Sequence, residues 1–208
     1  MPSWFRAHYL LPALILGAYF IFGLQHLTQF VTADEHYWVY ERIPQYWDAV
    51  ATGNWKKTFI NDKPGVSLAL VSGIGYSMHP DARRHCTEQG DRTLRCDVQN
   101  TESLYRDFRL PILIVNALVL LFLFWVIQKL SGYRVALLTL ILTALSPILL
   151  GASQIVNPDS LLWSFGTAAI FSFFALLRFE ERKYLFLTTI LTALAINSKY
   201  VAVILLPF

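Results

Sequence analysis

The sequence predicts an all-α polytopic membrane protein with a long outer loop that carries juxtamembrane helices. Hydrophobic residues make up 55% of the chain and charged residues only 15%, whereas soluble domains carry about 25% charged residues. The charges are also concentrated, because residues 31–109 hold 10 of the 17 Lys and Arg and 11 of the 14 Asp and Glu. The stretches on either side are long, apolar and nearly uncharged, which is typical of transmembrane helices.

Five apolar segments predict helices that cross a membrane, for which about 20 apolar residues are needed. The third and fourth are somewhat short but contain no charged residue. Polar residues around Lys199 interrupt the last, which is either one broken helix or two short helices meeting there. The segments are residues 9–30, 110–130, 135–150, 161–177 and 184–208.

The two ends of the chain carry separate predictions. The first apolar segment resembles a signal peptide, with Arg6 before it and small residues at 31–33 after it. Its apolar stretch exceeds the roughly 7–15 residues of a signal core, so we expect it to remain as an anchor. The chain stops within an apolar run at Phe208. We therefore expect residues 1–208 to be the N-terminal part of one transmembrane domain whose C-terminal remainder is absent.

The short connections predict the orientation in the membrane. Basic residues in cytoplasmic loops are the usual pattern, and long loops translocate largely regardless of charge. This pattern puts the loop at 31–109 and the turn at 151–159 on the outer side. The basic residues assigned to the cytoplasmic side are Arg6, Lys129, Arg134, Arg178, Arg182 and Lys183.

The outer loop is predicted to contain short elements of its own. Residues 36–51 interleave Tyr and Trp with charges, as segments at the headgroup level do. Residues 66–78 are apolar but too short to span, which indicates an interfacial or re-entrant helix. Cys86 and Cys96 form either a disulfide, in an oxidising compartment, or two free thiols. A metal site there lacks two well-spaced ligands.

Two adjacent carboxylates are the first candidates for catalysis. Asp34 and Glu35 follow the first apolar segment directly, at its outer end. A carboxylate at a membrane boundary is a usable general base for a hydroxyl group. The plainer interpretation is a helix-ending pair dissolved in water.

Five further charged residues are candidates for holding a phosphate or bracing those carboxylates. Asp62 and Lys63 precede the short loop helix, and a Lys can neutralise a phosphate or pair with a carboxylate. Asp159 begins the fourth span, where an Asp also simply stabilises a helix start. Lys199 lies within an apolar run. It is either a functional residue or a lysine whose side chain snorkels to the membrane interface. Arg109 heads the second span and serves as either a binding residue or an anchor.

Several function classes find no support. The chain has no Walker-type glycine loop, no Gly-x-Ser-x-Gly and no His-Glu-x-x-His. The basic residues form no stripe, so nucleic acid is not an expected partner. The sequence indicates no cofactor with certainty and leaves open whether a divalent metal takes part.

The order of these motifs resembles the GT-C glycosyltransferases, in particular the protein O-mannosyltransferase and aminoarabinose-transferase-like families (glycosyltransferase family 39-like). The resemblance rests on an outer Asp-Glu, a Lys-Pro before a short helix, an Arg-Leu-Pro opening the second span, an outer Asp opening the fourth, and a Ser-Lys-Tyr that breaks the last segment. These are residues 34–35, 62–65, 109–111, 159 and 198–200.

The resemblance implies a GT-C-like fold and an inverting transfer of a sugar from a polyprenyl-phosphate donor to a hydroxyl of a protein, lipid or glycan. Asp34, with Glu35 beside it, corresponds to the aspartate that acts on the acceptor. Lys63 corresponds to a lysine that faces the donor phosphate or braces the carboxylates. Asp62 and Gly65 depart from the family's Glu-Lys-Pro-Pro-like element, which leaves the substrate class and any metal open.

The resemblance also implies a cellular location and leaves two alternative functions open. The protein is expected to be a multi-pass protein of the plasma or inner membrane, surrounded by lipid, with its active site on the periplasmic or extracellular side. A transporter or flippase for a lipid-linked or anionic substrate is the alternative, but it should place ionisable groups mid-span. A non-catalytic membrane subunit, in which the carboxylates are simply solvated, is the third possible function.

Overall fold

The computed structural model describes residues 3–60, 64–79, 86–89, 93–96 and 101–206. Helices dominate these residues, and one short hairpin interrupts them. The elements are α1 Ser3–Gln25, α2 Ala33–Tyr37, η1 Trp38–Arg42, α3 Ile43–Ala51, η2 Trp55–Thr58, α4 Val66–Met78, β1 Cys86–Gln89, β2 Thr93–Cys96, α5 Thr101–Ser131, α6 Tyr133–Ala144, α7 Pro147–Ser153, α8 Pro158–Phe179, α9 Arg182–Ser198 and η4 Tyr200–Leu205.

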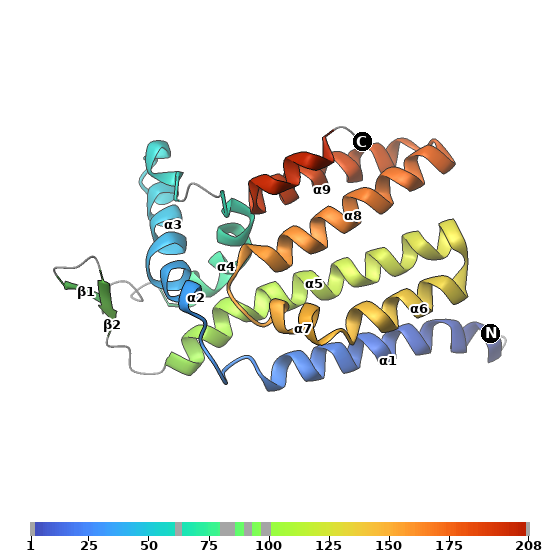
Figure 1. Cartoon of the computed structure of the whole chain (residues 1–208), viewed down its shortest axis with the longest axis horizontal. Helices are drawn as coiled ribbons and strands as arrows, with labels where there is room; N and C mark the ends of the chain where they lie inside the picture. Colours follow the sequence, from blue (N-terminus) through green and yellow to red (C-terminus); the bar gives the residue numbers. More distant parts are fainter. Residues whose placement is uncertain (1–2, 61–63, 80–85, 90–92, 97–100, 207–208) are drawn as a thin grey trace.

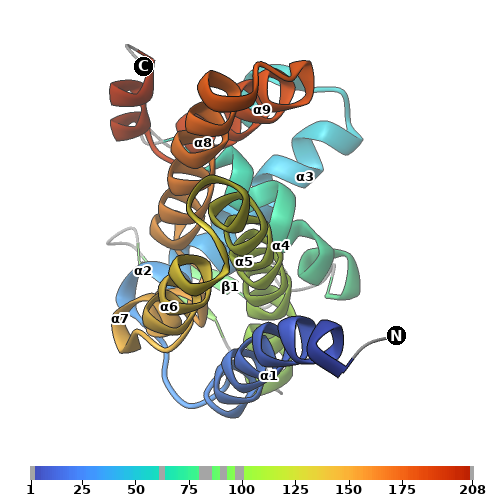
Figure 2. The same ribbon diagram turned by 90° about the vertical axis from the view of Figure 1, so that its right-hand side faces the viewer.

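The long helices run side by side and form a bundle around α5. Helix α5 contacts α1, α6 and α8, and α9 packs along α8. Figure 2 looks along the bundle and shows α5 between α1 on one side and the α8–α9 pair on the other. The apolar side chains of α5 therefore form the centre of the core, in which Ile112, Leu113 and Val126 are fully buried.

The bundle has two distinct ends. At one end lie α2, α3, α4, the hairpin and the connections at 26–32, 154–157 and 199, all on the left in Figure 1. We call this the loop end. The short turns between α5 and α6 and between α8 and α9 lie at the opposite end. We call that the basic end, because Lys129, Arg134, Arg178, Arg182 and Lys183 flank those turns.

Two of the described helices are long and apolar enough to cross a membrane. These are α5, over Glu102–Ser131, which contains an 18-residue stretch with a mean hydropathy of 2.8, and α8, over Pro158–Phe179, with a stretch of the same length at 1.8. A third span results if α6 and α7, which are bent by 64° at their junction, count as one. The predicted fold class, an all-α membrane protein, is confirmed.

The segment expected to be one helix at 135–150 is split in two. Pro147 has no backbone N–H, and its ring disfavours the helical conformation for the residue before it. Ser146 is accordingly extended, with φ −67° and ψ 119°, and α6 ends at Ala144. A second break follows α9, where Lys199 is extended with φ −158° and ψ 136°.

Helix α4 occupies the predicted range 66–78 and is packed within the loop end. It contacts α3, α5 and α9, and Leu68, Ala69 and Ser72 on it are fully buried. Glycine at position 75 lets α4 and α5 pack closely, because a Cβ at Gly75 would lie 2.6 Å from the backbone oxygen of Asp107 on α5. This helix is therefore a packed part of the bundle end.

The hairpin lies within the long loop between α4 and α5. Strands β1 and β2 are antiparallel, and Cys86 lies opposite Cys96 in their register. The side chains of both strands lie outside the described part of the chain. The disulfide therefore stays a prediction.

Candidate functional site

The site begins where α2 starts, directly after the first long helix. Thr32 caps α2, and Glu35 three residues later folds back onto it. The Thr32 backbone N–H donates to Glu35 Oε2 over 2.9 Å, and its hydroxyl donates to the same oxygen over 3.2 Å. This Thr-x-x-Glu arrangement is a capping box, which fixes the first turn of the helix.

A fully buried ion pair anchors this turn to α5. Arg109 Nε donates to Glu35 Oε1 over 2.8 Å, and Arg109 Nη2 donates to Oε2 over 2.7 Å. Both side chains are 0% exposed. The two parallel bonds make the bidentate geometry in which a guanidinium holds a carboxylate most strongly.

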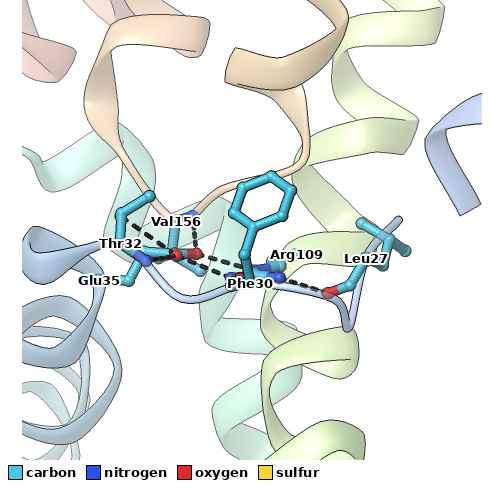
Figure 3. A network of polar contacts seen from close by, with 6 residues as sticks. All are labelled: Leu27, Phe30, Thr32, Glu35, Arg109 and Val156. Atoms are coloured by element: carbon cyan, nitrogen blue, oxygen red, sulfur yellow. Dashed lines mark hydrogen bonds and ion pairs between the residues drawn. The ribbon is translucent and has the colours of Figure 1, made fainter.

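The remaining polar groups of the pair are also bonded, as Figure 3 shows. The Val156 backbone N–H, in the connection between α7 and α8, donates to Glu35 Oε1 over 2.7 Å. Arg109 also donates to the carbonyl oxygen of Leu27, and over 2.5 Å to that of Phe30. One ion pair thus joins the segment after α1, the start of α2, helix α5 and the start of α8.

Aromatic rings cover the guanidinium. Its Cζ lies 5.1 Å from the centre of the Tyr105 ring and 5.9 Å from that of Phe30. Tyr40 packs edge-on against Tyr105, with ring centres 6.2 Å apart. Burial raises the pKa of the Tyr40 phenol, although its hydrogen bond with Tyr105 acts in the opposite direction. The pair is therefore shielded from water on this side.

The two adjacent candidate carboxylates have opposite environments. Glu35 is enclosed, and both its oxygens accept bonds from Arg109, Thr32 and Val156. Asp34 is exposed. Of the two, only Asp34 presents a carboxylate that a substrate hydroxyl can reach.

A second ion pair lies at the same end of the bundle. Lys199 Nζ lies 2.5 Å from Asp159 Oδ1, and the two side chains are 31% and 51% exposed. Asn157 caps α8 by accepting from the Asp159 backbone N–H over 2.9 Å. The pair fixes the break after α9 to the start of α8 and leaves both charges partly exposed.

The start of α4 is fastened next to that break. The Gly65 backbone N–H donates to the Ser198 carbonyl oxygen over 3.2 Å, and the Ser67 hydroxyl donates to the Leu194 carbonyl oxygen over 2.7 Å. Gly65 has a φ of +65°, which favours glycine, and a Cβ there would lie 2.0 Å from the Trp38 ring. The candidates Asp62 and Lys63 just before it lie outside the described residues.

The structure thus groups the described candidates into two sets at the loop end, where α2, the start of α8 and the end of α9 lie (Figure 1). Glu35 bonds to Arg109, and Asp159 bonds to Lys199. The two sets are linked through the chain, because Val156, bonded to Glu35, lies three residues before Asp159. Within the described residues, no group of three or more His, Cys, Asp or Glu could hold a metal ion.

An open groove of about 430 Å³ lies beside the second ion pair. It runs between η2 and the junction of α9 with η4. Its lining combines apolar and aromatic side chains with polar groups, among them Trp55, Lys56, Phe59, Asn197 and Tyr200. Trp55 and Phe59 are 70% and 69% exposed, as expected of side chains at a membrane boundary.

Sequence reasoning missed some contributors to the site. Thr32 carried a readable signal, because Thr-x-x-Glu predicts a capping box. The Val156 amide and the pairing of Glu35 with Arg109, 74 positions away, carried none, because both depend on how the helices pack.

The comparisons with known proteins identify the family. No curated protein and no solved structure matches the chain. The model of the dolichyl-phosphate-mannose-protein mannosyltransferase family matches residues 102–208, which is just over half of the chain. The match contains Arg109, Asp159 and Lys199. The chain therefore belongs to the dolichyl-phosphate-mannose-protein mannosyltransferase family and is a membrane glycosyltransferase of the mannosyltransferase type.

Proposed function

We propose that this protein transfers a sugar from a polyprenyl-phosphate-linked donor to a hydroxyl group at the loop end of the bundle, with Asp34 as the general base. The observation that carries this proposal is the exposed Asp34 carboxylate beside a buried ion pair, at the end that also holds Lys199 and Asp159. A reactive carboxylate on a rigidly held turn is what such a transfer needs.

The reaction is a single displacement with inversion at the anomeric carbon. The acceptor oxygen forms the new bond to that carbon while the bond to the phosphate oxygen breaks. Asp34 takes the proton of the acceptor hydroxyl, and the polyprenyl phosphate leaves with the electron pair. A cation near the departing phosphate stabilises its charge, and we assign this role to Lys199 and to Lys63.

The mannosyltransferase family of this chain makes a polyprenyl-phosphate mannose the first donor to test and a protein hydroxyl the first acceptor. The basic end would face the cytoplasm and the loop end the opposite side of a multi-pass membrane protein. The donor's lipid tail would hold its phosphate at the bilayer surface, the depth at which we expect the loop end to lie.

A transporter of lipid-linked or anionic substrates receives less support from the same geometry. Such a protein binds its substrate near the middle of the bilayer, between broken helices. Here the Glu35–Arg109 and Asp159–Lys199 pairs both lie at the loop end, because they join α2 to α5 and the start of α8 to the end of α9. That placement favours chemistry at the membrane surface.

The donor class can be tested directly with the natural protein in membranes or detergent. Radiolabelled mannose is supplied as polyprenyl-phosphate mannose or as a nucleotide-linked mannose, together with an acceptor protein or peptide rich in Ser and Thr. Transfer from the lipid-linked donor alone supports the proposal. Equal transfer from the nucleotide sugar, in membranes stripped of polyprenyl phosphate, would show that the donor class is wrong.

A further inference from the structure

A partly enclosed cavity of about 210 Å³ lies inside the bundle, below the loop end. Helices α1, α5, α6, α7 and α8 all contribute to its wall, and Asp159 at the start of α8 is one of the lining residues. Most of the wall is apolar, with Leu120, Leu149 and Trp163 among the lining side chains. One water occupies about 30 Å³ of liquid, so the cavity has room for a group much larger than one water.

Two polar groups on this wall, Asn116 Nδ2 and the Ser160 hydroxyl, are buried and have no hydrogen-bond partner in the part of the chain that the structure describes. Asn116 and Ser160 are only 2% and 4% exposed. The Asn116 side-chain oxygen accepts a bond from the Ser164 hydroxyl, but its Nδ2 has no hydrogen-bond partner among the described residues. The Ser160 hydroxyl has none there either. Buried donors without acceptors are rare in native proteins and cost free energy.

These groups restrict what can occupy the cavity. A hydrocarbon chain would suit the apolar wall but would leave Asn116 Nδ2 unpaired. An anion inside the cavity is disfavoured, because none of the lining residues is cationic and the wall is mostly apolar. A neutral ring with hydroxyl groups meets both requirements: after small side-chain rotations toward the cavity, Asn116 and Ser160 would donate to its oxygens, and its C–H face would pack on Trp163.

We propose that this cavity is a subsite for the sugar ring of the lipid-linked substrate, with Asn116 and Ser160 as the residues that hydrogen-bond its hydroxyl groups. The inference rests on the proposed function and names where the transferred sugar lies. The lining residue Asp159 is bonded to Lys199, so one wall of the cavity adjoins the cation that we assign to the phosphate.

A thiol introduced into the wall tests this occupancy without measuring catalysis. Ala152→Cys, on α7, puts a small thiol in the lining. The intact protein is labelled with N-ethylmaleimide, and the rate of modification is then read from the peptide that contains residue 152. Polyprenyl-phosphate mannose at roughly ten times its dissociation constant should slow the modification about tenfold, because about one site in eleven is then free. The same concentration of polyprenyl phosphate without sugar should leave the rate nearly unchanged.

Controls separate occupancy from general effects of lipid. Leu118→Cys lies on α5 outside the cavity lining, 60% exposed, and its modification should not respond to either ligand. If Ala152→Cys does not fold, Ile148→Cys at the same cavity serves instead. Equal protection by the two ligands would show that the carrier fills the cavity and would overturn the proposal. So would an absence of protection by either.

Variants of the two polar residues test the contacts themselves. Asn116→Leu and Ser160→Ala should each raise the dissociation constant of polyprenyl-phosphate mannose about three- to tenfold, with no such change for polyprenyl phosphate. Asn116→Gln, which keeps the amide, should recover part of the loss. An unchanged dissociation constant for the sugar-bearing ligand in both variants would overturn the assignment.

Failure of this inference can be told apart from failure of the proposed function. If the natural protein transfers sugar from polyprenyl-phosphate mannose but that donor does not protect the introduced thiol, the cavity assignment is wrong and the function stands. If Asp34→Asn keeps its transfer rate while protection is observed, Asp34 is not the base and the cavity assignment stands.

Discussion

Asp34 and Glu35 show how neighbouring residues of one chemical type can have different roles. The sequence places both at the outer end of the first apolar segment, and the resemblance assigns them together to catalysis. In the structure Glu35 is enclosed by Arg109 and two backbone N–H groups, whereas Asp34 is exposed. We propose that Glu35 positions the turn and that Asp34 acts on the acceptor. The sequence could not predict this division, because it depends on a partner 74 positions away.

Removing one member of the buried pair should destabilise the protein strongly. Arg109→Met leaves the Glu35 carboxylate buried without a counter-charge, which costs roughly 3–5 kcal/mol in comparable pairs. The double variant Glu35→Leu with Arg109→Met removes both charges and should recover part of that loss, since the Thr32 and Val156 N–H groups then lose their acceptor. Denaturation in detergent measures both changes. A single variant within about 1 kcal/mol of the natural protein would contradict the role given to this pair.

The exposed pair should behave in the opposite way. Lys199→Met removes a salt bridge whose side chains are 31% and 51% exposed, and such pairs contribute at most about 1 kcal/mol. The melting temperature should therefore change little, while sugar transfer falls because a cation near the phosphate is lost. Lys57→Met, on the exposed part of η2, serves as the matched control. Equal activity in both variants would argue against a role for Lys199.

At the scale of elements, the sequence predicted which helices exist better than where a helix is interrupted. The range 66–78 matches α4, and the segment 110–130 lies within α5. The segment at 135–150 has the composition of one span, but Pro147 breaks it into α6 and α7. Apolar composition predicts burial or lipid contact, whereas the break follows from the missing N–H and the ring of one proline.

The packing of α4 on α5 yields a test with a matched glycine. Gly75→Ala should destabilise the protein by about 1–3 kcal/mol, because the added Cβ would lie 2.6 Å from a backbone oxygen of Asp107. Gly151→Ala on α7 is the control, since nothing lies within 4 Å of its Cβ. That change should be neutral or stabilise by up to about 1 kcal/mol. Similar destabilisation by the two variants would contradict the close packing.

At the scale of the whole molecule, the separation into a loop end and a basic end agrees with what the charge pattern predicted. The resemblance and the alternation of apolar and charged segments could place the candidate residues on one side. They could not reveal that the Val156 amide links the Glu35–Arg109 pair to the start of α8. That link follows from α7 packing between α1 and α8, which no single segment encodes.

Thiols placed at the two ends should react from opposite sides of the membrane. Glu102→Cys and Asp159→Cys at the loop end should both react with an impermeant maleimide applied to the non-cytoplasmic side. Glu181→Cys at the basic end should react only after the membrane is opened. Reaction of the two loop-end thiols from different sides would rule out a shared site.

The account depends most on Asp34, and the transfer rate of Asp34→Asn tests it most directly. The rate is measured per folded molecule with polyprenyl-phosphate mannose, beside Glu102→Gln as an exposed carboxylate variant at the same end of the bundle. Loss of a general base lowers rates by about 10²- to 10⁴-fold, so Asp34→Asn should lose transfer to this extent with an unchanged melting temperature. Glu102→Gln should keep its rate. An Asp34→Asn variant that transfers sugar as fast as Glu102→Gln would contradict the proposed function of this carboxylate.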